Sequence, residues 1–164
     1  MRTMPGSKPF AIAFLILSFL GFLDSAYLTV EHYRGVAPPC SLLSGCERVT
    51  TSPYSRLLGV PVALAGAFYY LVLLLMTVFA LEEAAARALH WALRLAPLGF
   101  LASMWFVFVQ AFLLRAFCLY CLFSAATSTA LFAVALAYWR GAGLGRGGRP
   151  GCARRVSGAG SPAP

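Results

Sequence analysis

The chain has 164 residues, of which 60% are hydrophobic and only 11% are charged. An ordinary soluble domain is about half apolar and about a quarter charged, so this composition indicates a membrane protein. The formal net charge of +8 is interpreted as a signal of membrane topology and of contact with lipid headgroups. A nucleic-acid-binding function is not expected, because neither a folded basic module nor interleaved aromatic residues accompany the charge.

Four long stretches carry little or no charge, and each has about the 20 apolar residues that a helix needs to cross a bilayer. In chain order they are Pro9–Val30, Leu57–Leu81, Leu95–Leu114 and Ala116–Trp139. The first also resembles a secretory signal peptide, but its apolar run continues past Asp24 without a good cleavage site. The sequence therefore predicts an all-α membrane protein, a four-transmembrane-helix bundle over residues 1–140. Residues 141–164 are rich in Gly, Pro and Arg, which predicts a disordered tail.

The basic residues near the helix ends predict the orientation in the membrane. Nine of them lie at the N-terminus, in the loop 82–94 and in the C-terminal tail, whereas the other side carries four. The positive-inside rule then places both termini in the cytoplasm and the loop between the first two helices on the outer side. In a bacterium this is a multi-pass inner-membrane protein whose loop 31–56 faces the periplasm.

The five cysteines divide between the two sides of this predicted bundle. Cys40 and Cys46 lie in the outward loop, and Cys118 and Cys121 lie at the outer end of the fourth helix, whereas Cys152 lies in the cytoplasmic tail. The outer face of a bacterial membrane is oxidising, so disulfides form and persist there. Two cysteine pairs on one face can exchange a disulfide through a mixed intermediate, which predicts a redox relay.

The CxxC pair has the features of a reactive dithiol. Residues three apart share a helix face, so Cys118 and Cys121 can bridge each other. The helix N-terminus and the nearby Arg115 favour a thiolate at Cys118. Cys121 lies about one turn deeper, where an electron carrier dissolved in the membrane would meet it.

Two other interpretations of the cysteines stay open at this point. A CxxC is also half of a zinc site, but His32 and His90 lie away from the pair, so no metal site is predicted. The two pairs could also be structural disulfides of a non-catalytic four-helix membrane protein. The alternatives to a redox enzyme are therefore that non-catalytic protein and a thiolate metal-binding membrane protein.

Three motifs, "CSLLSGCERVTTS", "GVPVALAGAFYY" and "FCLYC", occur in this order between about Gly21 and Tyr138. With them the chain resembles the vitamin K epoxide reductase family in its bacterial form. The disulfide-bond protein B family also has four helices and two cysteine pairs, but there the CxxC comes first. The resemblance implies that Cys40 exchanges with a thioredoxin-like partner and that Cys46 attacks Cys118. It also implies that Cys121 and Ser52 lie next to a quinone.

The family resemblance implies a membrane thiol–disulfide oxidoreductase that supports disulfide formation in secreted proteins. It would reoxidise a thioredoxin-like (DsbA-like) periplasmic partner and reduce ubiquinone or menaquinone. No thioredoxin-like domain follows the fourth helix, so we expect the partner to be a separate protein. Animal members have an asparagine and a tyrosine where this chain has Val62 and Ala125. The resemblance therefore does not predict reduction of vitamin K epoxide.

Other side chains within the predicted spans are weaker candidates for the quinone site. Asp24 is the only acid inside a span, and such residues are costly and often functional. It could supply a proton for quinone reduction or hydrogen-bond a neighbouring helix. An aromatic group on the third helix could line a quinone pocket or face lipid, namely Trp105, Phe106, Phe108 and Phe112.

Overall fold

The computed structural model describes residues 7–36, 45–57, 59–81 and 86–147. Within them, four helices are long and apolar enough to cross a membrane. They are α1 (Ser7–Arg34), α3 (Val62–Leu81), α4 (Ala86–Phe108) with its π-helical continuation η3 (Val109–Leu114), and α5 (Leu119–Gly147). The predicted all-α fold with four membrane-spanning helices is confirmed.

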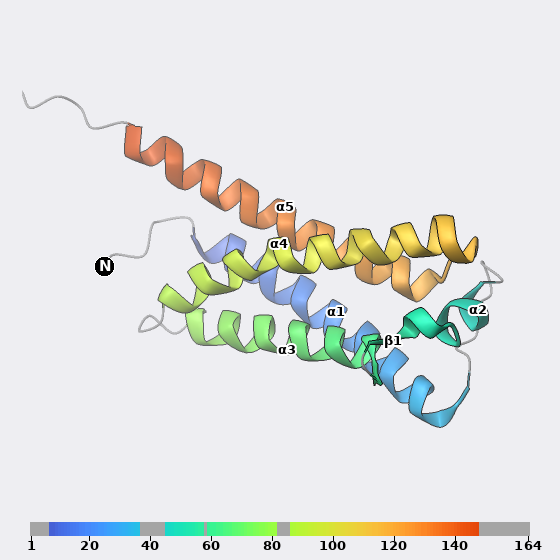
Figure 1. Cartoon of the computed structure of the whole chain (residues 1–164). Coiled ribbons are helices and arrows are strands. Elements are labelled where there is room, and N and C mark those ends of the chain that lie inside the picture. Colours follow the sequence, from blue (N-terminus) through green and yellow to red (C-terminus); the bar gives the residue numbers. More distant parts are fainter. Residues whose placement is uncertain (1–6, 37–44, 58, 82–85, 148–164) are drawn as a thin grey trace, which may run out of the picture.

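The long helices form a closed bundle (Figure 1). α1 packs against α3 and α5, and α4 packs against the same two helices, so each helix has two neighbours. The N-terminal end of α1 and the C-terminal end of α5 lie toward one end of the bundle in Figure 1. The opposite end gathers the C-terminal part of α1, the short helix α2 (Cys46–Thr50) and the junction between η3 and α5. We call this second end the redox end, because it holds Cys46, Cys118 and Cys121.

Short elements at the redox end connect α2 to α3. A 3-10 turn, η1 (Pro53–Ser55), leads into β1 (Arg56–Leu57), which pairs with β2 (Val60–Pro61) in antiparallel register. The sequence predicted helix from Leu57, but the helix begins only at Val62. Gly59 adopts φ +84° in the tight turn between the strands, a value that a helix does not allow. Pro61 also disfavours helical backbone at the residue before it.

Two other helix ends differ from the sequence-based boundaries. α4 begins at Ala86, so Arg87 and Arg94, which were predicted in a loop, lie on the helix. This segment is rich in Ala, Leu and Arg, which are strong helix formers, and its arginines are exposed. α5 continues to Gly147, past the predicted boundary at residue 140. The rest of the predicted tail lies outside the described residues.

The close-packed core fills the half of the bundle away from the redox end. Its buried members come from all four long helices and are mostly Ala and Leu, with two aromatic residues. They are Ala11, Phe14, Tyr70, Leu73, Leu89, Ala92, Leu93, Ala96, Leu131 and Ala135. Small side chains at helix interfaces permit close approach of membrane helices. This half therefore supports the redox end, which contains the shorter elements.

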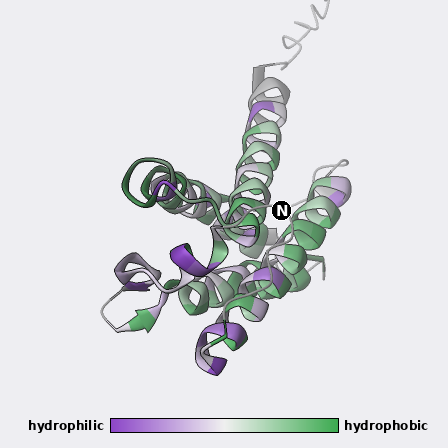
Figure 2. Ribbon diagram, turned by 90° about the vertical axis from the view of Figure 1, so that its right-hand side faces the viewer, coloured by the Kyte–Doolittle hydropathy of each residue, from purple (hydrophilic) through white to green (hydrophobic). Residues whose placement is uncertain are grey.

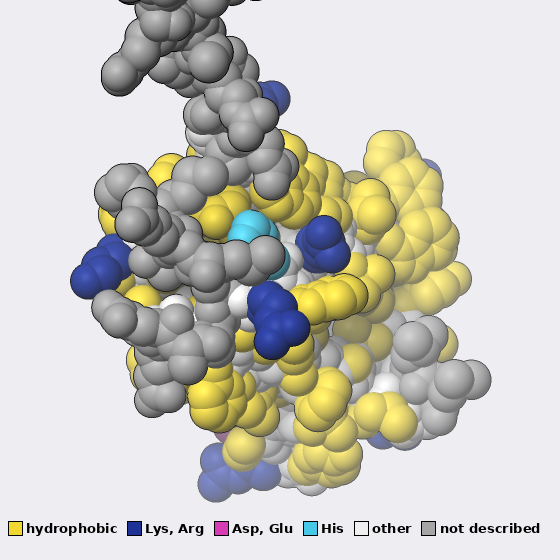
Figure 3. All heavy atoms as spheres, turned by 90° about the vertical axis from the view of Figure 1, so that its left-hand side faces the viewer, with side chains coloured by type: hydrophobic (Ala, Val, Ile, Leu, Met, Phe, Trp, Pro, Cys, Tyr) yellow, Lys and Arg dark blue, Asp and Glu magenta, His cyan; other side chains and the backbone are white. Residues whose placement is uncertain are grey.

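Polarity differs between the ends of the bundle and its sides. Hydrophobic residues cover most of the length of the helices, and hydrophilic residues stand out at the redox end, which faces the viewer in Figure 2. Basic side chains gather at the opposite end (Figure 3). The exposed basic residues that α1, α4 and α5 carry toward that end are Lys8, Arg87, Arg94 and Arg140. An apolar belt between two polar ends is the pattern expected of a bundle that spans a bilayer.

Candidate active site

The CxxC motif begins in the short link between η3 and α5, and Gln110 holds this link in place. The backbone N–H of Ala116 donates to the main-chain oxygen of Gln110 at 3.1 Å. The backbone N–H of Cys118 donates to the side-chain Oε1 of Gln110 at 2.8 Å. Arg115 ends η3 in the left-handed region at φ 48°. One buried glutamine therefore fixes both the turn and the first cysteine of the motif.

Cys118 stands immediately before the first residue of α5 and is fully buried. Its sulfur accepts a hydrogen bond from the Cys121 thiol and further ones from the backbone N–H groups of Cys121 and Tyr120. These bonds, the Cys121 thiol first, outweigh burial and lower the pKa of Cys118 from 9.0 to about 7. The sequence predicted a thiolate here from the helix N-terminus and from Arg115. The backbone N–H groups of the first turn contribute as expected, but the Cys121 thiol has the largest effect and Arg115 is not among the groups that shift this pKa.

The short helix α2 brings a third cysteine to the same place. Cys46, Val49 and Cys118 form a buried cluster, and Cys121 packs against it. Gly45 precedes Cys46 and lies so close to the link that a Cβ there would be 2.7 Å from the backbone N and O of Phe117. Only a glycine permits this contact, because backbone atoms cannot rotate away.

The three described cysteines differ in redox state. Cys46 is disulfide-bonded, with a partner sulfur that lies outside the described residues, whereas Cys118 and Cys121 are free thiols. Cys40, which was predicted to pair with Cys46, also lies outside the described residues. A buried disulfide sulfur thus packs in one cluster with a dithiol, which is the arrangement that exchange requires.

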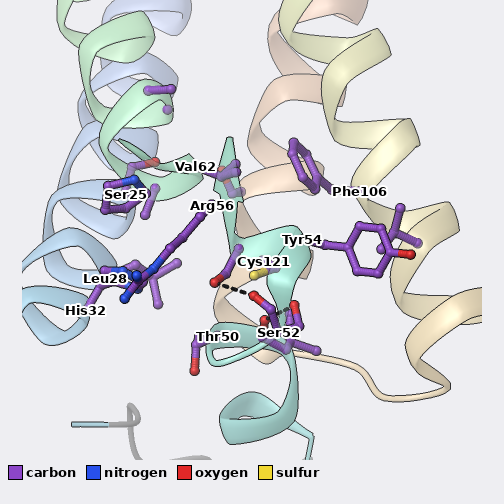
Figure 4. Close-up of a pocket in the computed structure, with 18 of the residues that line it drawn as sticks. Ser25, Leu28, His32, Thr50, Ser52, Tyr54, Arg56, Val62, Phe106 and Cys121 are labelled. Carbon is purple, nitrogen blue, oxygen red and sulfur yellow. Dashed lines mark hydrogen bonds between the residues drawn. The ribbon is translucent and has the colours of Figure 1, made fainter. Parts of the chain in front are cut away.

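Cys121 lines a cavity of about 850 Å³ between α1, α3, α4 and the segment 49–56. A volume of this size is typical of sites for small organic ligands. Its wall is largely apolar and includes Leu28, Val62 and Phe106. Figure 4 shows Cys121 and Ser52 between α1 on one side and Phe106 of α4 on the other. These walls suit a largely apolar molecule with a few polar atoms.

Comparison with known protein families agrees with this geometry. The model of the vitamin K epoxide reductase family matches residues 12–136, which is most of the chain. The chain belongs to the vitamin K epoxide reductase family. It is thus a multi-pass membrane thiol–disulfide oxidoreductase, of a family that is linked to quinones and works with thioredoxin-like partners. A search among curated proteins found no match.

Ser52, which the family resemblance placed near the quinone, lines the cavity. Its hydroxyl donates to the Val49 main-chain oxygen at 2.8 Å, and its own main-chain oxygen accepts from the Ser55 hydroxyl at 2.7 Å. The hydroxyl hydrogen of Ser52 is therefore already used in a hydrogen bond, while its oxygen can still accept one.

Among the aromatic candidates, Phe106 lines the cavity. The other three, Trp105, Phe108 and Phe112, are exposed and stack along the outside of α4 and η3.

Asp24 lies on another side of the CxxC motif. It lines a separate groove with Tyr27, Leu119 and Tyr120 rather than the cavity that holds Cys121. The carboxylate is close enough to Cys118 and Cys121 to interact with both electrostatically. Its Oδ2 is buried and makes no hydrogen bond within the described part of the chain. Asp24 is therefore placed to act on the dithiol and not directly on a ligand in the cavity.

Gln110 was not among the residues singled out from the sequence. It is the only Asn or Gln in the chain, and it falls within the uncharged stretch 95–114. A lone amide in a membrane helix is costly to bury, which is a signal of the same kind as the acid at Asp24. A search for every strongly polar side chain in the spans would have found it.

Proposed function

We propose that this protein carries electrons from a separate thioredoxin-like protein outside the cytoplasm to a quinone in the membrane. The partner leaves the reaction as a disulfide and is again able to oxidise secreted proteins. Cys40 and Cys46 form the outer pair, and Cys118 and Cys121 form the inner pair. The quinone, ubiquinone or menaquinone, is a substrate and occupies the cavity beside Cys121.

One observation carries the proposal, namely that the CxxC motif has a different neighbour at each sulfur. Cys118 packs with the disulfide-bonded Cys46. Cys121 lines the 850 Å³ cavity, whose apolar walls fit a quinone ring and the start of its isoprenoid tail. A purely structural dithiol needs no large cavity beside it.

The first half of the reaction is thiol–disulfide exchange. A partner thiolate attacks Cys40 of the outer disulfide, and the second partner thiol resolves the mixed disulfide, so the outer pair gains two electrons and two protons. When the inner pair is oxidised, the Cys46 thiolate attacks Cys118 and releases Cys121 as a thiolate. Cys40 then attacks Cys46 and releases Cys118, which leaves the outer pair oxidised and the inner pair reduced.

The second half reoxidises the inner pair. A quinone accepts two electrons and two protons when it becomes a quinol. Cys118 and Cys121 supply both electrons, lose their two S–H protons and form one S–S bond. Asp24 can take up a proton from the dithiol, because its carboxylate interacts with both sulfurs. Ser52 offers an acceptor oxygen on the wall of the cavity.

The exposed basic residues at the end away from the cysteines support a cytoplasmic location for that end. The redox end then faces the periplasm, where a soluble dithiol partner meets it. We propose the bacterial inner membrane as the location, with both termini in the cytoplasm.

Dithiol-driven reduction of a short-chain quinone by the purified protein in detergent tests this function. We expect turnover to be lost in Cys118→Ala and Cys121→Ala, and to be lost or strongly reduced in Cys40→Ala and Cys46→Ala. Cys152→Ala is the matched control and should keep the wild-type rate. Wild-type turnover in Cys118→Ala or Cys121→Ala would overturn the relay. Stoichiometric zinc in the reduced protein would instead favour metal binding.

A further inference from the structure

The Gln110 side chain has a fixed orientation. It is 2% exposed, and its amide faces the backbone N–H of Cys118 at 2.8 Å. A backbone N–H can only donate, so the amide must turn its oxygen toward Cys118. The NH₂ group, with its two donors, therefore points away from Cys118.

The NH₂ group of Gln110 is an uncommitted donor beside the cavity. Gln110 lines the same cavity as Cys121. Within the described part of the chain, its Nε2 donates no hydrogen bond, whereas its Oε1 is engaged. A donor on the wall of the cavity is available to a ligand or to water there.

Three other hydroxyl groups on the cavity wall are already occupied as donors, whereas those of Ser25 and Tyr54, which also line it, donate no hydrogen bond within the described residues. Ser52 donates to Val49, Tyr69 donates to the Leu95 main-chain oxygen at 3.1 Å, and Tyr70 donates to the Ser124 main-chain oxygen at 2.9 Å. A quinone presents two carbonyl oxygens, which only accept. Gln110 thus offers a donor of the kind that such a ligand requires, and its orientation is fixed by the bond to Cys118, on the wall that also contains Cys121.

We propose that Gln110 is a positioning residue that serves the dithiol and the quinone together. Its Oε1 holds the backbone of Cys118 at the start of α5, and its Nε2 donates a hydrogen bond to one carbonyl oxygen of the quinone. This inference rests on the proposed function, because it requires a quinone in the cavity. As electrons reach the ring, negative charge grows on that oxygen, and a fixed donor stabilises it.

Two variants separate the roles of the amide oxygen and the amide NH₂ group. Gln110→Glu keeps an oxygen for Cys118 but replaces the NH₂ donor, and Gln110→Leu removes both groups.

Three measurements are made on each variant. The first is binding of ubiquinone-1 to the resting protein by equilibrium dialysis at several pH values. The second is the carbonyl stretching band of bound, ¹³C-labelled quinone. The third is reduction of the inner disulfide by dithiothreitol in the absence of quinone. Thr77→Val is the control, since Thr77 is buried, bonds within the described residues to the Leu73 oxygen alone, and is not part of the cavity lining.

We expect both variants to bind quinone roughly 10- to 100-fold more weakly at high pH, because one hydrogen bond to the quinone is lost. In Gln110→Glu the difference from wild type should shrink as the pH falls, because a carboxylic acid donates and a carboxylate cannot. The carbonyl band should lie at lower frequency in wild type than in Gln110→Leu. Reduction by dithiothreitol should stay near the wild-type rate in Gln110→Glu and slow in Gln110→Leu.

Wild-type binding and an unshifted carbonyl band in Gln110→Glu at every pH would overturn the inference while leaving the proposed function intact. A defect of Gln110→Glu that does not change with pH, or that stays equal to the defect of Gln110→Leu even at low pH, would reduce Gln110 to a packing role and also overturn it. If the wild-type protein itself neither binds nor reduces the quinone, the proposed function is wrong, and the role of Gln110 fails with it. The wild-type arm therefore distinguishes the two failures.

Discussion

Cys118 combines complete burial with a lowered pKa, and its hydrogen bonds explain the combination. Burial alone disfavours a thiolate and raises the pKa of a thiol. The Cys121 thiol and two backbone N–H groups of the first turn of α5 outweigh that effect. A sulfur that is a thiolate near neutral pH is a good leaving group in exchange with Cys46. The hydrogen bonds at the start of α5 therefore make Cys118 suitable for disulfide exchange with Cys46.

The Cys121 donor can be tested by titration of the Cys118 thiolate in a background without Cys40, Cys46 and Cys152. Thiolate absorbance near 240 nm should appear as the pH rises through about 7 and vanish below it, because a thiol with a lowered pKa is ionised above that value. Cys121→Ala removes the donor, so the midpoint should move up toward 9.0. Cys121→Ser keeps an O–H donor and should stay close to the unsubstituted protein. Equal midpoints for alanine and serine would refute the role of the Cys121 donor.

At the scale of elements, the contact between α2 and the link 115–118 decides whether the two cysteine pairs can communicate. α2 has only five residues and holds Cys46 in the buried cluster with Cys118. Its approach depends on Gly45, which lies against the backbone of Phe117. Gln110 fixes the other side of the contact through its bonds to Ala116 and Cys118.

Gly45→Ala should separate the two pairs without damage to the inner one. The added Cβ overlaps backbone atoms, so α2 must shift, at a cost of about 1–3 kcal/mol. When prereduced protein is mixed with quinone, the inner pair should react at the wild-type rate. Electrons from the outer pair should follow about tenfold more slowly. Gly141→Ala is the matched control, because nothing lies within 4 Å of a Cβ there. If electrons from the outer pair follow at the wild-type rate in Gly45→Ala, the close contact of Gly45 with Phe117 is not required for transfer between the pairs.

The fold could be predicted from the sequence mainly where hydrophobic length decides the structure. The four spans are such cases, because about 20 apolar residues in a bilayer have few alternatives to a helix. The start of α3 was predicted too early. The strand pair β1–β2 depends on Gly59 and Pro61, and hydropathy alone does not register their effect within an apolar stretch. The π-helical turn η3 was also missed. Such turns are rare and frequent at functional sites, and here Gln110 within the turn accepts hydrogen bonds from Ala116 and Cys118.

The candidate site was predictable only in part. Spacing and topology were enough to bring the CxxC motif to one end of the bundle and to favour a thiolate at Cys118. The placement of Asp24 in a separate groove, and of Phe106 alone among four aromatic residues in the cavity, depends on helix rotation. Helix rotation follows from side-chain packing, which hydropathy does not specify when all faces of a helix are apolar.

At the scale of the whole molecule, the two halves of the bundle have different structures. The half away from the cysteines is a close-packed core of small and apolar side chains. The redox half contains the cavity, the short elements and the three described cysteines. The close packing of one half and the cavity of the other therefore divide the bundle into a supporting part and a part that can hold a ligand.

The orientation of the molecule can be tested with its own cysteines. The excess of basic residues on one side predicts that Cys152 is cytoplasmic and that Cys40 is periplasmic. In variants that keep only one of these cysteines, a membrane-impermeant maleimide should label Cys40 in intact spheroplasts. Cys152 should be labelled only after lysis. The reverse pattern would invert the topology and place the redox end in the reducing cytoplasm.

The central claim is that electrons pass from the outer pair through the inner pair to a quinone, and a single-turnover stoichiometry tests it most directly. Fully reduced protein, freed of dithiol, is mixed with excess ubiquinone-1, and the quinone consumed is counted against thiols titrated in denaturant. We predict one quinone for each dithiol: two for wild type, one for Cys46→Ala, and none for Cys118→Ala, whose outer thiols stay free. Consumption of quinone by Cys118→Ala would contradict the account, because the outer pair would then reach the quinone without the CxxC motif.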